Sequence, residues 1–448
     1  MASDFDALPS DNMRAMNLRG IIELHCRKIL IVLLGVALLN RVVVRAALGE
    51  SYFWTNSYSA YYDLAENIVS GKGFCFDTTC AFWPPLYPLF LALTALGGKH
   101  YLLIVIPQAL MGAGTALCAF LIGRNLFNTF VGILACAITT IYPYYVMHDT
   151  ALQETGMVTF WTALSVYLLL RASKLNRKAD WFLAGLAFGL IALTRASVAP
   201  AAGIALIWTA AWGTRRGIRD KVLNTSLVLL AILLMIGPWL IRTYRLTGAA
   251  VLSSQTGSAL WKGNNPQTFS AYPVRSIDIS TGDAWTAVPE ADKADLDRLA
   301  SDEIKESNWY ARRALVFIRE HPWLTVENAF RKLEAAFSWK LNPVREPLAQ
   351  ASYASFYVPV SILGMIGFFL GRHNRGVILI GMLFIAFTAV TAVFWAHTSH
   401  RSYLDVYLIV LAASVIDRLV AWIQTRKDRA TAGVAGTKGI QVLRKLDS

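Results

Sequence analysis

The chain has 448 residues, of which 55% are hydrophobic and 16% are charged, and its mean hydropathy is +0.45. Because soluble domains average about 45–50% apolar and about 25% charged residues, this composition excludes an ordinary soluble domain and predicts an all-α polytopic membrane protein. The net charge of +13 lies outside the polar stretch 243–350, which holds 13 basic and 13 acidic residues, so we expect no nucleic-acid partner.

Long apolar segments follow one another along the chain. A helix needs about 20 residues to cross about 30 Å of hydrocarbon. The run 84–96 is shorter and begins with three prolines in five positions, so we expect a re-entrant segment there rather than a span. We expect about ten transmembrane helices, at roughly 29–48, 101–123, 128–147, 154–171, 180–197, 198–213, 222–241, 352–371, 376–395 and 403–423.

The distribution of basic residues predicts which side of the membrane each end of these segments faces. If 84–96 does not cross the bilayer, the basic clusters between the spans share the side of the N-terminus, which is the positive-inside pattern. Both termini are then cytoplasmic. The predicted organisation is a cytoplasmic N-terminal segment (1–28), a transmembrane core (29–242) with a first outer loop (49–83) and the re-entrant segment (84–96), an outer loop domain (243–350), C-terminal transmembrane helices (351–423) and a cytoplasmic tail (424–448).

The two long outer segments are also expected to contain helices. We expect interfacial helices in the first outer loop, and the apolar residues of 290–340 recur at helical spacing, so the large outer loop should be mostly helical. Cys75 and Cys80 lie in the first outer loop, either paired in an oxidising compartment or present as two free thiols.

Ionisable side chains gather at the outer ends of the predicted spans, where they are costly beside hydrocarbon and tend to be functional. An isolated Arg can simply reach to lipid headgroups. Three of them beside several carboxylates favour a shared site for an anion, because a guanidinium binds phosphate through two parallel hydrogen bonds, and a nearby carboxylate would then serve as a general base. The candidates are Glu50, Asp63, Glu66, His148, Asp149, Glu154, Arg195, Arg242, His397, His400 and Arg401.

Aromatic residues crowd the same predicted face. Most of them fit an interfacial aromatic belt, and some are suited to stack on sugar rings. The residues expected to bind substrate are Tyr61, His148, Asp149, Trp261, Asn264 and His400.

Eight short motifs occur in a fixed order between residues 61 and 412. They are YYDLAENIVSGKGF (61–74), WPPLYPLFLAL (83–93), YP…LQET (142–155), LTRA (193–196), PWLIRTYRLTG (238–248), LWKGNNP (260–266), IREHP (318–322) and HRSYLDVYLIVLA (400–412). With these motifs the chain resembles the bacterial family 39 glycosyltransferases of the GT-C class, which are related to protein mannosyltransferases and to the lipid A aminoarabinose transferase. The resemblance implies a GT-C-like fold in the bacterial inner membrane, with a site that faces the periplasm. It also implies inverting transfer of a monosaccharide from a polyprenyl-phosphate donor to an envelope lipid, glycan or protein.

The resemblance also implies roles for single residues. The family usually has a catalytic Asp where this chain has Ser57, and a Pro after Thr-Arg where it has Ala196. The nearest acids are Asp63 and Glu66, and we expect Asp63 to be the base. The residues expected to act beside it are Glu66 and Glu154 in acid–base catalysis and Arg242, Arg401 and Arg195 at the donor phosphate.

The sequence also bears on a metal cofactor and on two other classes of function. No ligand spacing is diagnostic for a metal, so we expect none to be required, although the closeness of His148, Asp149 and Glu154 leaves a divalent ion possible. Buried Arg and carboxylate side chains also suit a transporter or flippase of an anionic lipid or lipid-linked sugar, but the two related halves common in transporters are not seen. The Ser at 57 also fits an inactive homologue that acts as a scaffold.

Overall fold

The computed structural model of the chain describes residues 18–55, 58–76, 78–270, 272, 288–342, 344–395 and 397–446. All the elements of regular structure in these ranges are helices, as the composition predicts. Eight of them are long and apolar enough to cross a membrane: α2 (Leu18–Thr55), α5 (Tyr101–Leu126), α8 (Thr155–Leu175), the run of η1 (Ala196–Val198), α10 (Pro200–Trp208) and η2 (Thr209–Gly213), α11 (Ile218–Thr247), α17 (Pro347–Gly371), α18 (Arg375–Val393) and the run of α19 (Thr398–Arg401), η3 (Ser402–Leu404) and α20 as far as Arg426.

Three further apolar helices are shorter. α4 (Leu86–Ala95) occupies the proline-led run, and its 10 residues match the short segment expected there. α6 (Thr129–Ile141) and α9 (Lys178–Thr194) have 13 and 17 residues and occupy two of the ten predicted spans. The count of ten, the re-entrant course of 84–96 and the domain boundaries therefore stay predictions.

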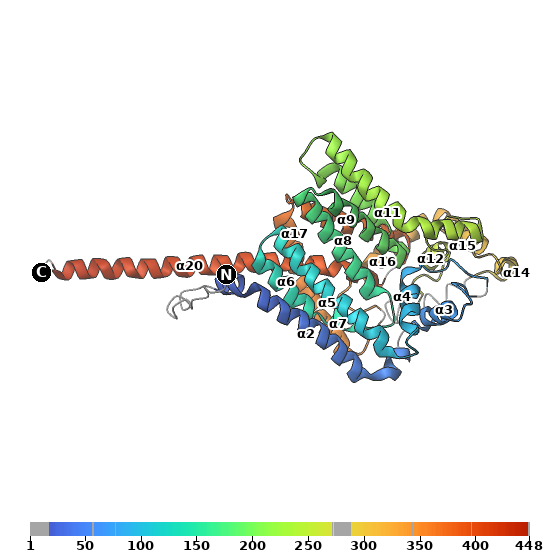
Figure 1. The fold of residues 1–448 in the computed structure, drawn as a ribbon, viewed down its shortest axis with the longest axis horizontal. Helices are drawn as coiled ribbons and strands as arrows, with labels where there is room; N and C mark the ends of the chain where they lie inside the picture. Colours follow the sequence, from blue (N-terminus) through green and yellow to red (C-terminus); the bar gives the residue numbers. More distant parts are fainter. Residues whose placement is uncertain are drawn as a thin grey trace, which may run out of the picture.

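The helices form one bundle with two distinct ends (Figure 1). The start of α2 and the emerging part of α20 (Asp405–Leu446) lie at one end, which we call the terminal face. At this face the Arg19 guanidinium pairs with the Asp417 carboxylate and so ties α2 to α20. The opposite end, which we call the loop face, carries α3 (Ser59–Val69), α12 (Thr256–Gly263), α14 (Glu290–Leu299) and α15 (Glu303–Glu320).

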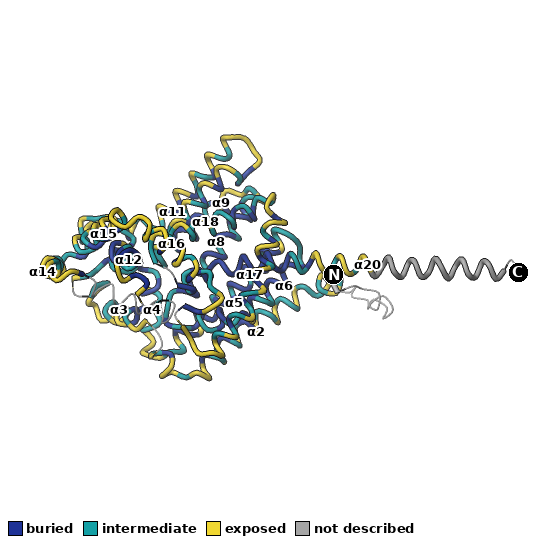
Figure 2. The backbone as a smooth tube through the Cα atoms, turned by 180° about the vertical axis from the view of Figure 1, so that it is seen from behind, coloured by how far each residue is buried: buried dark blue, intermediate teal, exposed yellow. Residues whose placement is uncertain are grey.

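The core is built around the first turns of α20. Residues 401–414 are all buried, and Figure 2 shows the buried segments concentrated inside the bundle. A helix that is apolar on every side must be surrounded by other helices. α17 approaches α20 closely at Gly364 and Gly367, where a side chain would meet the backbone of Leu408 and Leu411. Small residues allow this close contact between helices in a membrane.

The segment 49–83, which we call the first long loop, is fastened to the loop face from two later parts of the chain. Cys75 and Cys80 form a disulfide within it. The buried Glu303 carboxylate on α15 accepts hydrogen bonds from the backbone N–H groups of Cys80 (2.9 Å) and Ala81 (3.0 Å) and from the Ser254 hydroxyl (2.7 Å). A carboxylate that accepts several hydrogen bonds is well satisfied although it is buried. Residues 80–81 of the loop are therefore held against α15.

Replacing Gly367 by alanine tests the contact between α17 and α20. The added Cβ overlaps the Leu411 backbone, which cannot rotate away as a flexible side chain could. We expect Gly367→Ala to lower the free energy of unfolding by about 1–3 kcal/mol, as overpacked cores do. Gly203→Ala on α10 is the control, because nothing lies within 4 Å of its Cβ position. Thermal unfolding midpoints in one detergent measure both, and an equal midpoint for the two variants would contradict the contact.

Candidate functional site

A cavity of about 820 Å³ opens where the loop-face segments meet the bundle. It combines ionisable and aromatic side chains with an apolar wall from α10, α18 and the segments beside them. The polar and aromatic members include Tyr58, Tyr61, Trp83, Glu154, Arg195, Lys262, His397, His400 and Tyr403, and the apolar members include Val198, Pro200, Phe387, Val390 and Phe394. This composition, in a volume within the usual range for ligand sites, identifies the cavity as the candidate functional site.

Glu154 and Arg195 form an ion pair in the cavity wall. Glu154 is the residue that precedes the first turn of α8, where the helix dipole favours a negative charge. Arg195 follows the last turn of α9 in an extended conformation. Its Nε and Nη2 lie 2.9 and 2.8 Å from Glu154 Oε1, and Nη2 also donates to the Thr155 hydroxyl at 3.1 Å. The two side chains are 13% and 12% exposed, so the pair is held by the fold yet reachable from the cavity.

Tyr61 supplies a further contact to the same carboxylate. It lies on the buried face of α3 and its hydroxyl hydrogen-bonds Glu154. Burial, and then the charge of Glu154, raise the pKa of Tyr61 well above its ordinary value. The phenol therefore stays protonated and donates to Glu154, which orients the carboxylate.

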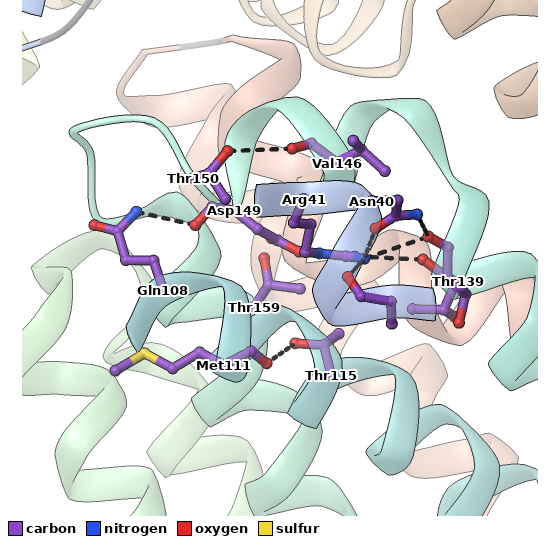
Figure 3. Close-up of polar contacts among 12 residues, drawn as sticks. Asn40, Arg41, Gln108, Met111, Thr115, Thr139, Val146, Asp149, Thr150 and Thr159 are labelled. Atoms are coloured by element: carbon purple, nitrogen blue, oxygen red, sulfur yellow. Dashed lines mark hydrogen bonds and ion pairs between the residues drawn. The ribbon is translucent and has the colours of Figure 1, made fainter. Parts of the chain in front are cut away.

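The connection that leads into Glu154 is held by buried side chains from α2 and α5 (Figure 3). Arg41 Nε donates to Asp149 Oδ2 at 2.8 Å, with both side chains buried. Gln108 Nε2 donates to the carbonyl oxygens of Asp149 (2.9 Å) and Ala151 (2.7 Å), and Gln108 Oε1 accepts from the Tyr87 hydroxyl (3.0 Å). Residues 149–151 therefore have little freedom, and this fixes the start of α8.

Arg45, one helical turn beyond Arg41, holds the same connection. Its Nη2 donates to the Met147 carbonyl at 2.8 Å and its Nε to the Thr150 hydroxyl at 3.2 Å. Burial raises the pKa of Asp149, and the charge of Arg41 opposes this shift. Asp149 does not line the cavity, and its carboxylate pairs with Arg41 of α2.

The Arg41–Asp149 pair should matter far more to stability than an exposed pair. We expect Arg41→Met to cost about 3–5 kcal/mol, because it leaves a buried carboxylate without its partner. Arg41→Met combined with Asp149→Leu should be less destabilised than the single variant, since it removes both charges. The control is Arg331→Met at the exposed Glu327–Arg331 pair, which should cost about 0–1 kcal/mol. Thermal unfolding of the purified variants measures all three, and a double variant worse than the single one would contradict this role.

Besides Asp149, three of the predicted substrate-binding residues do not line the cavity. The His148 ring stacks on Tyr144 at 4.1 Å, and burial, followed by the charges of neighbouring Arg side chains, lowers the pKa of His148 to about 3. Trp261 packs in a small hydrophobic cluster with Tyr310. Asn264 Nδ2 donates to the Val393 carbonyl at the end of α18.

Two of the three predicted phosphate-binding Arg residues are engaged elsewhere. Arg401 is fully buried and donates to both oxygens of Asp405 at 3.0 and 3.2 Å, to the Ala336 carbonyl and to the Tyr353 hydroxyl. Arg242 donates to the carbonyls of Cys80 (2.9 Å) and Phe74 (3.0 Å) and so fastens the first long loop. Neither residue lines the cavity, whereas Arg195 does.

The acids predicted in the first long loop point away from the cavity. α3 buries Tyr61 and Tyr62 and exposes Asp63 and Glu66, and Glu66 lies 3.7 Å from the Lys99 ammonium. Ser57 lies outside the described residues. Of the candidates named from the sequence, the structure brings Tyr61, Glu154, Arg195, His397 and His400 together at the cavity.

Lys262 is a charged cavity residue that sequence reasoning missed. It stands in the LWKGNNP motif, which the resemblance had already singled out, two positions before the chosen Asn264. The next residue must be Gly263, because a side chain there would overlap the Phe394 carbonyl. α12 thus passes directly against the end of α18, and Lys262 lines the cavity between them. Burial lowers the pKa of Lys262.

Metal ligands do not gather in the part of the chain that the structure describes. No group of three or more His, Cys, Asp or Glu side chains there is placed to hold a metal ion. Asp149 and Glu154, which are close in sequence, bind different Arg residues, Arg41 and Arg195. The expectation that no metal is required stays a prediction.

Comparisons with known proteins agree with this architecture. Residues 83–241 match the family model described as dolichyl-phosphate-mannose-protein mannosyltransferase. The fold is similar to the crystal structure of the apo oligosaccharyltransferase of Archaeoglobus fulgidus, with a TM-score of 0.54 and 14% identity over 89% of this chain and 52% of that one. The AglB oligosaccharyltransferase of the same organism, in complex with an inhibitory peptide and a dolichol-phosphate, gives a TM-score of 0.52 and 14% identity over 91% and 52%.

ArnT from Cupriavidus metallidurans, bound to undecaprenyl phosphate, gives a TM-score of 0.36 and 14% identity over 80% of this chain and 72% of that one. No curated protein matches the sequence.

The chain is therefore a multi-pass helical membrane protein with the fold of the GT-C glycosyltransferases. Its central part matches the protein mannosyltransferase family, so the resemblance read from the sequence motifs is confirmed. The chain spans about half the length of the oligosaccharyltransferases that share its fold. Glu154 and Arg195 both lie within the matched residues 83–241.

Proposed function

We propose that the protein is an inverting glycosyltransferase that moves a monosaccharide from a polyprenyl-phosphate donor to an envelope lipid, glycan or protein. In this proposal the loop face is exposed on the periplasmic side of a bacterial inner membrane. The observation that carries the proposal is the cavity in which a carboxylate, two cationic side chains and two His residues meet an apolar wall formed by spanning helices. These are the groups that a lipid-linked sugar phosphate requires.

The donor is recognised by charge at one end and by apolar contact at the other. Arg195 and Lys262 neutralise the phosphate, and the side chains of Val198, Phe387 and Val390 contact the first part of the polyprenyl chain. The contacts of Arg195 with Glu154 and Thr155 use Nε and Nη2, so its Nη1 can serve a phosphate oxygen. The dolichol-phosphate in the AglB complex supports a lipid phosphate as the ligand of this fold.

Transfer takes place by one displacement with Glu154 as the base. Glu154 accepts the proton of the acceptor hydroxyl as its oxygen attacks the anomeric carbon. The bond from that carbon to the phosphate oxygen breaks on the opposite face, and the electron pair leaves with the lipid phosphate. Arg195 and Lys262 stabilise the charge that builds up on this leaving group. A single displacement inverts the anomeric configuration.

Glu154→Gln tests the base. The amide keeps the shape of the side chain but cannot accept a proton at neutral pH, so we expect turnover to fall by about 10²- to 10⁴-fold. Asp63→Asn is the matched control, because Asp63 is an exposed acid of the first long loop. Mass spectrometry of polyprenyl-phosphate sugars and envelope glycans in cells that carry each variant measures the outcome. Glu154→Gln should accumulate one lipid-linked sugar and lose one decoration, and Asp63→Asn should resemble wild type.

The opposite result would move the base to the first long loop. A dead Asp63→Asn variant beside an active Glu154→Gln variant would restore the assignment made from the sequence resemblance. Activity in both variants would remove the acid–base role from both residues.

The charge of Lys262 should set the alkaline limit of donor binding. Because burial lowers its pKa, Lys262 loses its proton at a lower pH than an exposed lysine, and donor affinity then falls as the pH rises. Lys262→Arg keeps the charge at all these pH values, so the alkaline limb of the kcat/KM profile should move to higher pH. Lys262→Met should raise KM and abolish this limb. If the alkaline limb of the kcat/KM profile stayed at the same pH in Lys262→Arg, Lys262 would not be the group that titrates.

A further inference from the structure

Helix α16 (Pro322–Phe337) turns polar side chains inward and apolar side chains outward. Asn328 and Lys332 are 4% and 0% exposed, whereas Trp323, Val326 and Phe330 are 84%, 48% and 69% exposed. A helix on the surface of a water-soluble domain shows the reverse arrangement, with its apolar stripe facing the core. The exposed face of α16 therefore suits a surrounding that is not bulk water.

The surface of α16 divides into three sectors around its axis. With 3.6 residues per turn, Trp323, Val326 and Phe330 fall within about 60° of arc. A neighbouring sector of similar width carries the exposed charges Glu327, Arg331 and Glu334. The remaining side, with Asn328, Lys332, Ala335 and Ala336, faces the protein. A helix at the edge of a bilayer needs these three sectors, one each for lipid, water and protein.

Contacts with α18 fix the level of α16 relative to the membrane. The Lys332 ammonium donates to the carbonyls of Ala392 (2.9 Å) and Val393 (3.2 Å). These are the last two residues of the spanning helix α18, where backbone carbonyls have no partner within the helix. α16 therefore lies where α18 leaves the hydrocarbon.

Contacts with α17 give the same level independently. The hydroxyls of Tyr353 and Tyr357, in the first turns of the spanning helix α17, donate to the carbonyls of Ser338 (3.0 Å) and Phe337 (3.1 Å). Between the two helices stands Trp339, 56% exposed, with the Lys340 ammonium 5.3 Å from its ring centre. Tryptophan and lysine are typical of membrane interfaces. Figure 1 accordingly shows α16 between the bundle and the helices of the loop face.

We propose that α16 lies in the lipid headgroup region on the loop face and inserts Trp323, Val326 and Phe330 into the bilayer. The partner of this surface is the lipid bilayer, not a protein. The inference does not depend on the proposed sugar transfer. It has a mechanical consequence for the cavity, because Lys332 also contacts Asn264 Oδ1 at 3.4 Å, two residues from Lys262. The lipid contact and one wall of the cavity thus belong to one rigid unit.

Spin labels in the full-length protein test this placement. Cys26, Cys118 and Cys136 are replaced by alanine, and the Cys75–Cys80 disulfide is kept. Single variants Trp323→Cys, Val326→Cys and Phe330→Cys probe the apolar sector, and Glu327→Cys, Arg331→Cys and Glu334→Cys probe the charged one. Each labelled protein is reconstituted into vesicles of phosphatidylethanolamine and phosphatidylglycerol. Collision with oxygen, which concentrates in lipid, is compared with collision with a water-soluble nickel complex. Ile362→Cys, an exposed position in the middle of the spanning helix α17, and Lys305→Cys on α15 serve as lipid and water references.

The expected result is a switch between neighbouring positions of one helix. Labels at 323, 326 and 330 should resemble the lipid reference, and labels at 327, 331 and 334 should resemble the water reference. Equal access of nickel to all six positions would overturn the proposal. Low access of both reagents to 323, 326 and 330 would also overturn it, because it would show a protein partner or a second copy on this face. The mild Val326→Cys exchange and its neighbour Glu327→Cys decide the matter even if Trp323→Cys fails to fold.

Discussion

The buried ion pair between Arg41 and Asp149 is the contact on which the candidate site depends most. It joins the first described spanning helix to the segment that precedes Glu154, and both partners are shielded from solvent. An unpaired charge in such surroundings is strongly unfavourable, so separating the two side chains would cost much free energy. Gln108 and Arg45 bind the backbone of the same segment, so the short irregular connection is held at several points along its length. The position of Glu154 at the start of α8 follows from this.

Much of the architecture could be predicted because few backbone conformations satisfy all their hydrogen-bonding groups inside a bilayer. Apolar runs of sufficient length must be helices, and the runs near α2, α5, α8, α11, α17 and α18 coincide with spanning helices of the structure. The proline-led run contains only the short helix α4. Prediction is weaker where apolar runs are short or interrupted, as at α6, which ends at Ile141 before the short α7 (Pro143–His148).

The site was harder to predict, because residue type does not reveal how a polar side chain is used. Arg195, Arg242 and Arg401 all stand at ends of apolar segments and look alike in sequence. Only the structure shows that Arg242 binds backbone carbonyls and that Arg401 pairs with Asp405, whereas Arg195 reaches the cavity. Likewise, Glu154 and Arg195 were both candidates, but 41 positions separate them and nothing in their order pairs them. Lys262 was overlooked because Asn264, two positions later, seemed the more suitable ligand. In the structure Asn264 donates instead to the Val393 carbonyl at the end of α18.

The fastening of the first long loop by Glu303 has a consequence for how the protein is made. The carboxylate stands 223 positions after Cys80, whose backbone it binds, and Ser254, which shares it, also comes late in the chain. During synthesis the early helices therefore enter the membrane well before the group that locks residues 80–81 exists. The wall formed by Phe394, His397 and His400 arrives later still. Each new molecule must therefore pass through a stage in which its early helices are inserted and its cavity is not yet assembled.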